Sequence, residues 1–271
     1  MRWPSRSWQF GLLAAVLAIG AADILWAPRG DGASSVNSLV FFPDRFSDPS
    51  ARRFAEAVAN GQVEAALSAA KTAPGGVNAV GTNGATGLIM AVERQNKPMV
   101  EALLKAGARP NGVPDRAPLH MAVGVRDMAI VRMLLAAGAD PNATMDTETP
   151  LYEAGLVGEI DAARALLDAG ADIDKADEVG KTPMLVASNT DHWRTVAFLL
   201  DHGASLWKDA NGITVAESAA TSRILPNNDE GRALPQVIEK IKAAGYPWPP
   251  PTVKDVRALK AAGKWPPPGK P

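Results

Sequence analysis

The chain has no cysteine, few aromatic residues and almost no net charge. Without thiols it cannot form disulfides, bind metals through thiolates or use a cysteine nucleophile, and it tolerates an oxidising compartment without mispairing. Aromatic residues make up 6% of the 271 positions, which leaves little material for stacking nucleic-acid bases. The formal net charge of −1 provides no basic surface to displace phosphate counterions. We therefore expect no nucleic-acid partner.

Catalytic and cofactor motifs are also missing. The sequence has neither a Gly-x-Ser-x-Gly nucleophile turn nor a Gly-x-x-x-x-Gly-Lys-Ser/Thr phosphate loop. The three histidines, His120, His192 and His202, do not match a zinc spacing. Acidic residues gather in predicted loops, where solvated loop tips are far more common than acid–base pairs. These absences predict a chain that is not an enzyme and has no cofactor and no metal site.

The N-terminal apolar segment is short. The charge-free run 7–22 falls below the about 20 residues that a membrane-spanning helix needs. Arg2 and Arg6 precede an apolar stretch, 10–19, and small residues follow at 20–22. This layout predicts that residues 1–25 are a signal peptide or, alternatively, an uncleaved N-terminal membrane anchor.

Either alternative places the body of the chain outside the cytoplasm. It would be periplasmic, or attached to the inner membrane and facing the periplasm, whereas a cytosolic chain is a third alternative. No cysteine follows the apolar stretch, which excludes a lipid-modified bacterial lipoprotein.

Four glycines end apolar, helix-like segments at nearly constant spacing. They are Gly107, Gly138, Gly170 and Gly203, and the intervals between them are 31, 32 and 33 residues. A motif that recurs at such a period predicts a stacked array of small units. Each unit buries its apolar face against its neighbours, because it cannot bury that face alone.

The units also begin alike. The clearest starts are Thr-Pro-Leu-Tyr-Glu-Ala at 149–154 and Thr-Pro-Met-Leu-Val-Ala at 182–187, with variants at 86–91, 117–122 and 214–219. Threonine caps a helix N-terminus, and proline is favoured in the first turn. Glycine supplies the left-handed residue that ends the second helix. Each unit is therefore predicted to be a helix–turn–helix pair.

These motifs resemble the ankyrin repeats, whose hallmark is Thr-Pro-Leu-His-x-Ala followed by Gly-Ala-Asp about 20 residues later. The resemblance covers roughly residues 50–245 and implies an all-α, ankyrin-repeat solenoid of stacked helix-turn-helix units with loop hairpins, over residues 48–245. Departures from the hallmark are Gly87, Ala117 and the pair 215–216. The resemblance also implies that His120 is structural and bridges neighbouring loops by hydrogen bonds.

Segments of different composition flank the repeats. Residues 26–47 are predicted to be a linker and an N-terminal clasp, because small polar residues at 30–35 precede apolar ones at 41–46. Residues 246–271 form a Pro/Trp-rich C-terminal tail with one short helix, which Thr252 is placed to cap. We expect this tail to cover the last repeat; alternatively, its tri-proline stretches bind aromatic-lined grooves. Residues 225–231 are predicted to be a surface loop.

The resemblance further implies that the loop tips and the ends of the first helices line a concave face that binds a partner protein. Polar residues such as Glu93 and Arg94 lie towards the outer units, and apolar residues towards the middle ones. An apolar centre with a polar rim is typical of a protein interface; alternatively, neighbouring repeats or the tail cover some of these side chains. The expected partner-binding residues are Val113, Pro114, Arg116, Val125, Met145, Asp146, Glu148, Leu156, Val157, Glu178, Val179 and Lys181.

The sequence as a whole is similar to exported ankyrin-repeat proteins of Gram-negative bacteria. That similarity implies a non-enzymatic protein-binding module in the periplasm, a monomer when free. One expected role is an immunity protein that neutralises a secreted toxin such as a phospholipase effector. The alternatives are an accessory scaffold for a periplasmic enzyme such as a catalase, or a structural protein of the envelope.

Overall fold

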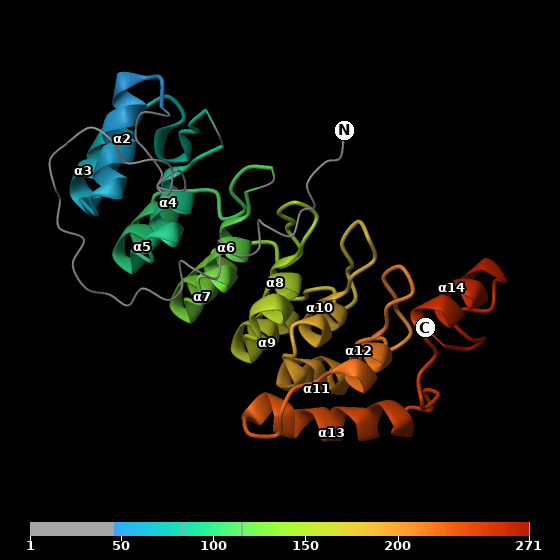
Figure 1. Ribbon diagram of the computed structural model, residues 1–271. Coiled ribbons are helices and arrows are strands. Elements are labelled where there is room, and N and C mark those ends of the chain that lie inside the picture. Colours follow the sequence, from blue (N-terminus) through green and yellow to red (C-terminus); the bar gives the residue numbers. More distant parts are fainter. Residues whose placement is uncertain (1–45, 83, 115, 271) are drawn as a thin grey trace, which may run out of the picture. The chain divides into compact units, whose positions relative to one another are not determined.

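The computed structural model describes residues 46–82, 84–114 and 116–270 (Figure 1). They belong to one compact unit of the chain. The predicted export segment 1–25 and nearly all of the predicted linker lie outside the described residues. Within the described part of the chain, no helix has the length and apolar character of a membrane span.

Helices follow one another in pairs along the described chain, as Figure 1 shows. The first helices contact each other in the order α2, α4, α6, α8, α10 and α12, and the second helices in the order α3, α5, α7, α9, α11 and α13. The predicted all-α solenoid is therefore confirmed. The pairs are α2 (Pro49–Ala59) with α3 (Val63–Ala70), α4 (Gly87–Glu93) with α5 (Lys97–Lys105), α6 (Pro118–Gly124) with α7 (Met128–Ala136), α8 (Pro150–Val157) with α9 (Ile160–Asp168), α10 (Pro183–Asn189) with α11 (Trp193–Asp201), and α12 (Val215–Thr221) with α13 (Asp229–Ala243).

Threonine side chains begin four of the first helices, as predicted. Each accepts a hydrogen bond from the backbone N–H three residues later, which satisfies a donor that the helix leaves unpaired. The capping residues are Thr86, Thr149, Thr182 and Thr214. Of the other two, α2 is capped by Asp48, which accepts from the N–H groups of Ser50 and Ala51. At α6, Ala117 replaces threonine and no side-chain cap forms, so proline alone favours the helix there.

The four periodic glycines are all left-handed, also as predicted. Their φ angles are +90° at Gly107, +84° at Gly138, +89° at Gly170 and +92° at Gly203. A Cβ at any of them would meet nothing within 4 Å. Glycine is therefore needed here for its backbone conformation and not for space.

Gly87 departs from the hallmark proline for a different reason. A Cβ at this position would lie 2.5 Å from Cζ of Phe54, which is fully buried between α2 and α4. The large Phe54 ring therefore takes the space that the proline ring occupies in other repeats. Phe46, within the predicted clasp, is also buried in this end of the core.

Polar side chains tie each repeat to the next. Asn78 donates to the Gly107 carbonyl at 2.9 Å and accepts from the Arg109 N–H at 2.7 Å. These bonds join the start of one repeat to the start of the next, and so fix the spacing of the hairpins that follow. The equivalent contacts are those of Asn111 with Asp140, of Asn142 with Gly170 and Asp172, and of Asp174 with Ser205.

Short hairpins precede the first helices, as the resemblance implied. Isolated antiparallel bridges join Val80 to Thr86, Val113 to Arg116, Met145 to Glu148 and Ala210 to Ile213. Between the last two, the N–H of Asp177 donates to the Lys181 carbonyl and closes a comparable hairpin. The described residues contain no β-strand longer than these isolated bridges.

The predicted surface loop 225–231 is partly wrong. Its last three residues belong to α13, whose first turn begins at Asp229. Asn228 caps this helix by accepting from the Gly231 N–H at 2.8 Å. Gly231 also passes so close to the Leu225 carbonyl that a Cβ would lie 1.9 Å from its oxygen. The loop is therefore shorter than predicted and ends in a capped helix.

The C-terminal tail packs on the last repeat. Its helix α14 (Val253–Ala261) begins at Thr252 with a reciprocal capping box to Asp255, and buries Val256 completely. Trp207 stacks on Tyr246 with ring centroids 4.5 Å apart and meets Trp265 at 5.6 Å. The expected covering role of the tail is therefore what the described residues show.

Candidate interaction surface

The predicted partner-binding residues lie in three consecutive hairpins and at the ends of two helices. We call the hairpins 113–116, 145–148 and 177–181 the hairpin face. The inter-repeat bonds of the asparagine and aspartate side chains hold these hairpins at regular spacing. The hairpin face contains Val113, Pro114, Arg116, Met145, Asp146, Glu148, Glu178, Val179 and Lys181, while Val125 follows α6 and Leu156 and Val157 end α8.

These residues differ in exposure. Pro114, Asp146, Glu178 and Val179 are exposed, and the exposed fraction of the Val179 side chain is 50%. The remaining predicted residues are half-buried, and Val157 packs against the core. The predicted apolar centre is therefore mainly a half-buried layer, and the exposed tips combine two acidic residues with two apolar ones.

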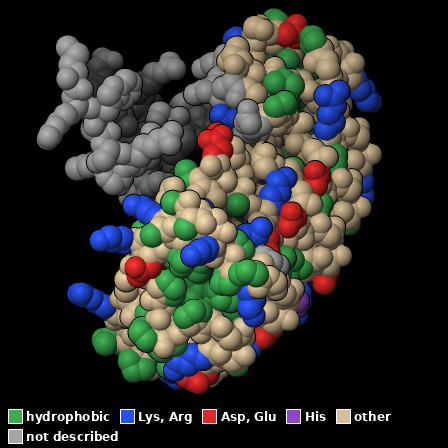
Figure 2. All heavy atoms as spheres, turned by 90° about the vertical axis from the view of Figure 1, so that its right-hand side faces the viewer, with side chains coloured by type: hydrophobic (Ala, Val, Ile, Leu, Met, Phe, Trp, Pro, Cys, Tyr) green, Lys and Arg blue, Asp and Glu red, His purple; other side chains and the backbone are tan. Residues whose placement is uncertain are grey.

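Figure 2 presents one face of the molecule. Hydrophobic side chains gather in its lower half, with Lys, Arg, Asp and Glu side chains scattered around them. Among the described residues, the exposed large apolar side chains are Val80, Val179 and Leu225. Val80 precedes α4 in a hairpin like those of the hairpin face, and the pattern of apolar residues did not identify it in advance.

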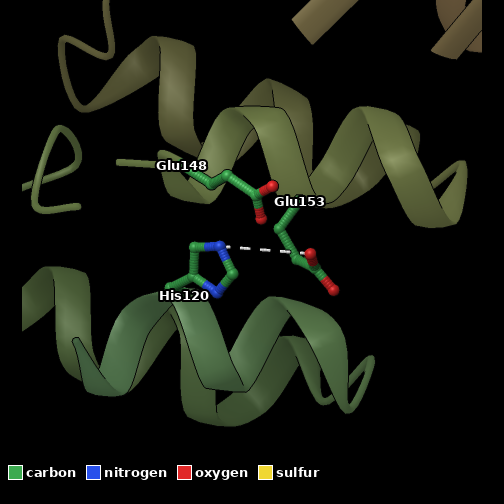
Figure 3. A group of neighbouring side chains, drawn as sticks. All are labelled: His120, Glu148 and Glu153. Carbon is green, nitrogen blue, oxygen red and sulfur yellow. Dashed lines mark ion pairs between the residues drawn. The ribbon is translucent and has the colours of Figure 1, made fainter. Parts of the chain in front are cut away.

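Three ionisable side chains from two neighbouring repeats meet behind the hairpin face (Figure 3). His120 lies in the first turn of α6, Glu148 ends the next hairpin, and Glu153 lies in α8. One nitrogen or oxygen of each side chain lies within 4.8 Å of those of the other two. The closest ion-pair contact is 4.0 Å, between Nε2 of His120 and Oε2 of Glu153.

His120 does not make the predicted hydrogen bond through Nε2. This atom is buried and has no hydrogen-bond partner among the described residues. Burial lowers the pKa of His120 to about 4, although the charge of Asp146 opposes the shift. The imidazole is therefore neutral at pH 7, and one of its nitrogens carries a free lone pair.

The two carboxyl groups are unusual for the same physical reason. Burial raises the pKa of Glu153 to about 7, and the charge of Glu148 adds to the shift. The pKa of Glu148 is also raised, mainly by burial and then by Asp177 and Asp146. The cluster therefore combines a neutral nitrogen donor with two carboxylates that are poorly compensated, which is chemistry suited to holding a proton or a cation.

A third perturbed carboxyl group, apart from the His120 cluster, lies at the end of α4. Burial raises the pKa of Glu93 to about 7, and the charges of Arg116 and Arg94 only partly oppose it. Sequence reasoning placed Glu93 on the polar rim. It did not anticipate this shift, because the burial results from packing between repeats.

A hollow of about 400 Å³ lies near the C-terminal tail. It is lined by residues that include Trp207, Lys240 and Lys270. None of the lining residues is a histidine or a member of the His120 cluster, and the hollow is open to solvent. It is therefore a separate feature from the His120 cluster.

Comparison with known proteins gives one consistent similarity. A family model described as ankyrin repeats (3 copies) matches residues 54–145 and 120–210, which together span more than half of the chain. A segment of 66 residues is 35% identical to mouse "Ankyrin repeat, SAM and basic leucine zipper domain-containing protein 1". Another of 59 residues is 37% identical to human "Transient receptor potential cation channel subfamily A member 1".

These relatives are similar over short stretches only. The first match covers 24% of this chain and 14% of the mouse protein, and the second covers 22% of this chain and 5% of the human protein. The similarity therefore concerns the repeat itself and not the rest of either relative.

Proposed function

Because this chain belongs to the ankyrin-repeat family, we propose that it is a protein-binding module that holds a partner protein on its hairpin face. The observation that carries this proposal is the regular display of three hairpins. Their tips are exposed at Pro114, Asp146, Glu178 and Val179, while their bases are fixed by bonds between repeats. A rigid display lowers the entropy that a partner loses on binding.

The chemistry of the tips favours a partner with basic and small apolar groups. Asp146 and Glu178 are exposed acidic side chains, and Val179, next to Glu178, is an exposed apolar one. Opposite charges at the rim would guide the encounter, and burial of the apolar centre would provide most of the affinity.

We further propose that the protein acts in the periplasm, either released or attached to the inner membrane through residues 1–25. The basic start, the apolar stretch 10–19 and the small residues after it support export. The absence of cysteine suits an oxidising compartment. Our preferred role is an immunity protein that neutralises a secreted toxin such as a phospholipase effector. An accessory scaffold for a periplasmic enzyme and an envelope structural protein are the alternatives.

A matched pair of substitutions tests the hairpin face. The partner is first recovered by crosslinking and affinity purification from envelopes of the native organism. Val179→Lys places a positive charge in the proposed interface, opposite the expected basic groups, whereas Leu225→Lys makes the same kind of change at a similarly exposed site after α12. We expect Val179→Lys to weaken binding by about tenfold or more and Leu225→Lys to leave it unchanged. Equal affinities for the two variants would contradict a partner on the hairpin face.

Export is tested separately. Residues 1–35 are fused to a reporter that is active only outside the cytoplasm, and a control fusion carries Leu13→Asp and Leu17→Asp in the apolar stretch. We expect activity from the first fusion and none from the second, because charges prevent insertion of the stretch. A silent but well-expressed first fusion would contradict the periplasmic location and leave the binding proposal standing.

A further inference from the structure

The stack brings together three metal-ligating side chains, a histidine from one repeat and two glutamates from the next. His120 is held at the start of α6, while Glu148 and Glu153 flank the start of α8, which Thr149 caps. Figure 3 shows the imidazole and the two carboxyl groups turned towards one another between the two helices. Their ligand atoms lie within 4.8 Å of each other.

The observation that most favours a ligand at this place is the buried Nε2 atom of His120. The side chain is 4% exposed, and Nε2 has no hydrogen-bond partner among the described residues. The Glu153 oxygen at 4.0 Å is too distant for a hydrogen bond. An unsatisfied buried polar atom is costly and rare, so a group that fills the space between these side chains would remove a real penalty.

The excess of negative charge around the three side chains also favours a bound cation. Glu148 and Glu153 approach each other behind the hairpin face, and Asp146 and Asp177 are near enough to act on Glu148. Lys181 is the basic residue that opposes them there. A divalent cation between the carboxylates would offset this excess of negative charge.

We propose that His120, Glu148 and Glu153 bind a divalent transition-metal ion, with Zn²⁺ as the best fit. An imidazole nitrogen with two carboxylate oxygens is a donor set that zinc accepts, whereas Mg²⁺ and Ca²⁺ prefer oxygen alone. Three protein ligands leave a fourth tetrahedral position for water. At zinc distances the donor atoms would be about 3.4 Å apart, so they must close by about 1 Å. Glu148 is half-buried and can supply most of this movement.

The ion would join two consecutive repeats. His120 belongs to the repeat that begins with α6, and both glutamates belong to the repeat that begins with α8. Glu148 is also the last residue of the hairpin that contains Met145 and Asp146. A bound ion would therefore fix the central hairpin, whether or not a partner protein occupies the hairpin face.

Zinc chloride titrated into the full, tag-free chain after chelator treatment tests the site. We expect one Zn²⁺ per chain with a Kd of about 1 μM or tighter. Glu148→Gln and Glu153→Gln should each weaken binding by about tenfold or more, because each removes a ligand. Glu178→Gln removes the same charge from the next hairpin, where it is not a ligand, and should change the affinity less than twofold.

Two further measurements keep the outcome decisive. Glu148→Gln changes a half-buried residue, so circular dichroism should show an intact helical fold. It is therefore a better test than His120→Gln, which changes a buried residue and could disturb the fold itself. Co²⁺ bound in place of zinc should give the visible absorption of a tetrahedral site, and Glu148→Gln should abolish it. Absence of stoichiometric zinc binding, or binding that Glu148→Gln and Glu178→Gln affect equally, would overturn the proposal. Equal affinities for Mg²⁺ and Zn²⁺ would overturn it as well.

Discussion

The last hairpin and the hairpin face have the same backbone arrangement but different surroundings. The last hairpin, with its bridge from Ala210 to Ile213, is covered by α14. Arg257 donates to the Asn211 carbonyl at 2.7 Å, and Lys260 pairs with Asp209 at 3.0 Å. The tips of the hairpin face have no such cover among the described residues, and Asp146, Glu178 and Val179 remain exposed.

This difference indicates which contacts a hairpin tip of this chain can make. Asp177 and Asp209 occupy equivalent positions, since each lies five residues before the threonine that caps the following helix. The chain's own tail satisfies Asp209 with a lysine and the hairpin carbonyl with an arginine. A partner protein on the hairpin face is expected to offer similar basic groups.

The largest loss of stability should come from removal of Trp207, the aromatic side chain on which the C-terminal tail packs. Trp207 is buried and contacts both Tyr246 and Trp265, so Trp207→Ala leaves a cavity and loosens the tail. We expect a loss of about 3–5 kcal/mol in the free energy of unfolding, measured by urea denaturation. Trp248→Ala, which truncates a half-buried tryptophan of the tail, should cost less. Equal losses for the two variants would show that Trp207 does not anchor the cover.

The next prediction compares two glycines with the same φ of +89°, Gly212 and Gly170. Alanine at either position must adopt a left-handed conformation, which costs about 1–2 kcal/mol. At Gly212 the new Cβ would also lie 2.7 Å from the Val253 carbonyl oxygen, whereas at Gly170 it would meet nothing within 4 Å. Gly212→Ala should therefore destabilise the protein by about 1–3 kcal/mol more than Gly170→Ala. Identical unfolding free energies for both variants would mean that α14 does not rest on the last hairpin.

The smallest change in stability concerns the carboxyl group of Glu93. Unlike Asp209, which pairs with Lys260, Glu93 is buried with only partial compensation of its charge. Burial raises the pKa of Glu93 from 4.5 to about 7 in the folded protein. The folded state therefore binds the proton more tightly, and the associated stability is present below pH 4.5 and is lost as the pH rises through 7. Glu93→Gln should match the wild type at pH 4.5 and exceed it by about 1–2 kcal/mol at pH 8, after allowance for partial solvent screening.

Urea denaturation of both proteins across this pH range, in the presence of a chelator, measures the difference. Glu56→Gln on α2, at an exposed carboxylate, is the control and should show no such pH-dependent gain. A Glu93→Gln curve parallel to that of the wild type from pH 4.5 to 8 would contradict the burial of this carboxyl group.

The repeats could be predicted from the sequence because each of their signals is local. Threonine before a first helix and glycine after a second helix act on the adjacent turn, so Thr149 and Gly170 can be interpreted without knowledge of the neighbouring repeats. The start of α13 had such a signal too, because Asn228 precedes two acidic residues in the first turn. The turn-forming residues before Asn228 favoured a loop instead, so the predicted loop extended too far.

The His120 cluster could not be predicted from the same signals. His120 and Glu153 are on different repeats, and only the packing of α6 against α8 brings them together. Glu153 occupies the variable position of the repeat hallmark, where no pattern marks it as buried. The half-burial of Val113 and Leu156 has the same origin, since neighbouring repeats and not the local sequence determine how much of each side chain is covered.

The hairpin face is tested most directly by hydrogen–deuterium exchange of the protein alone and in complex with the partner recovered from native envelopes. We expect the partner to slow exchange in hairpins 113–116, 145–148 and 177–181 and to leave the covered hairpin 210–213 unchanged. Slower exchange confined to the second helices α5, α7 and α9, or to the C-terminal tail, would contradict this expectation.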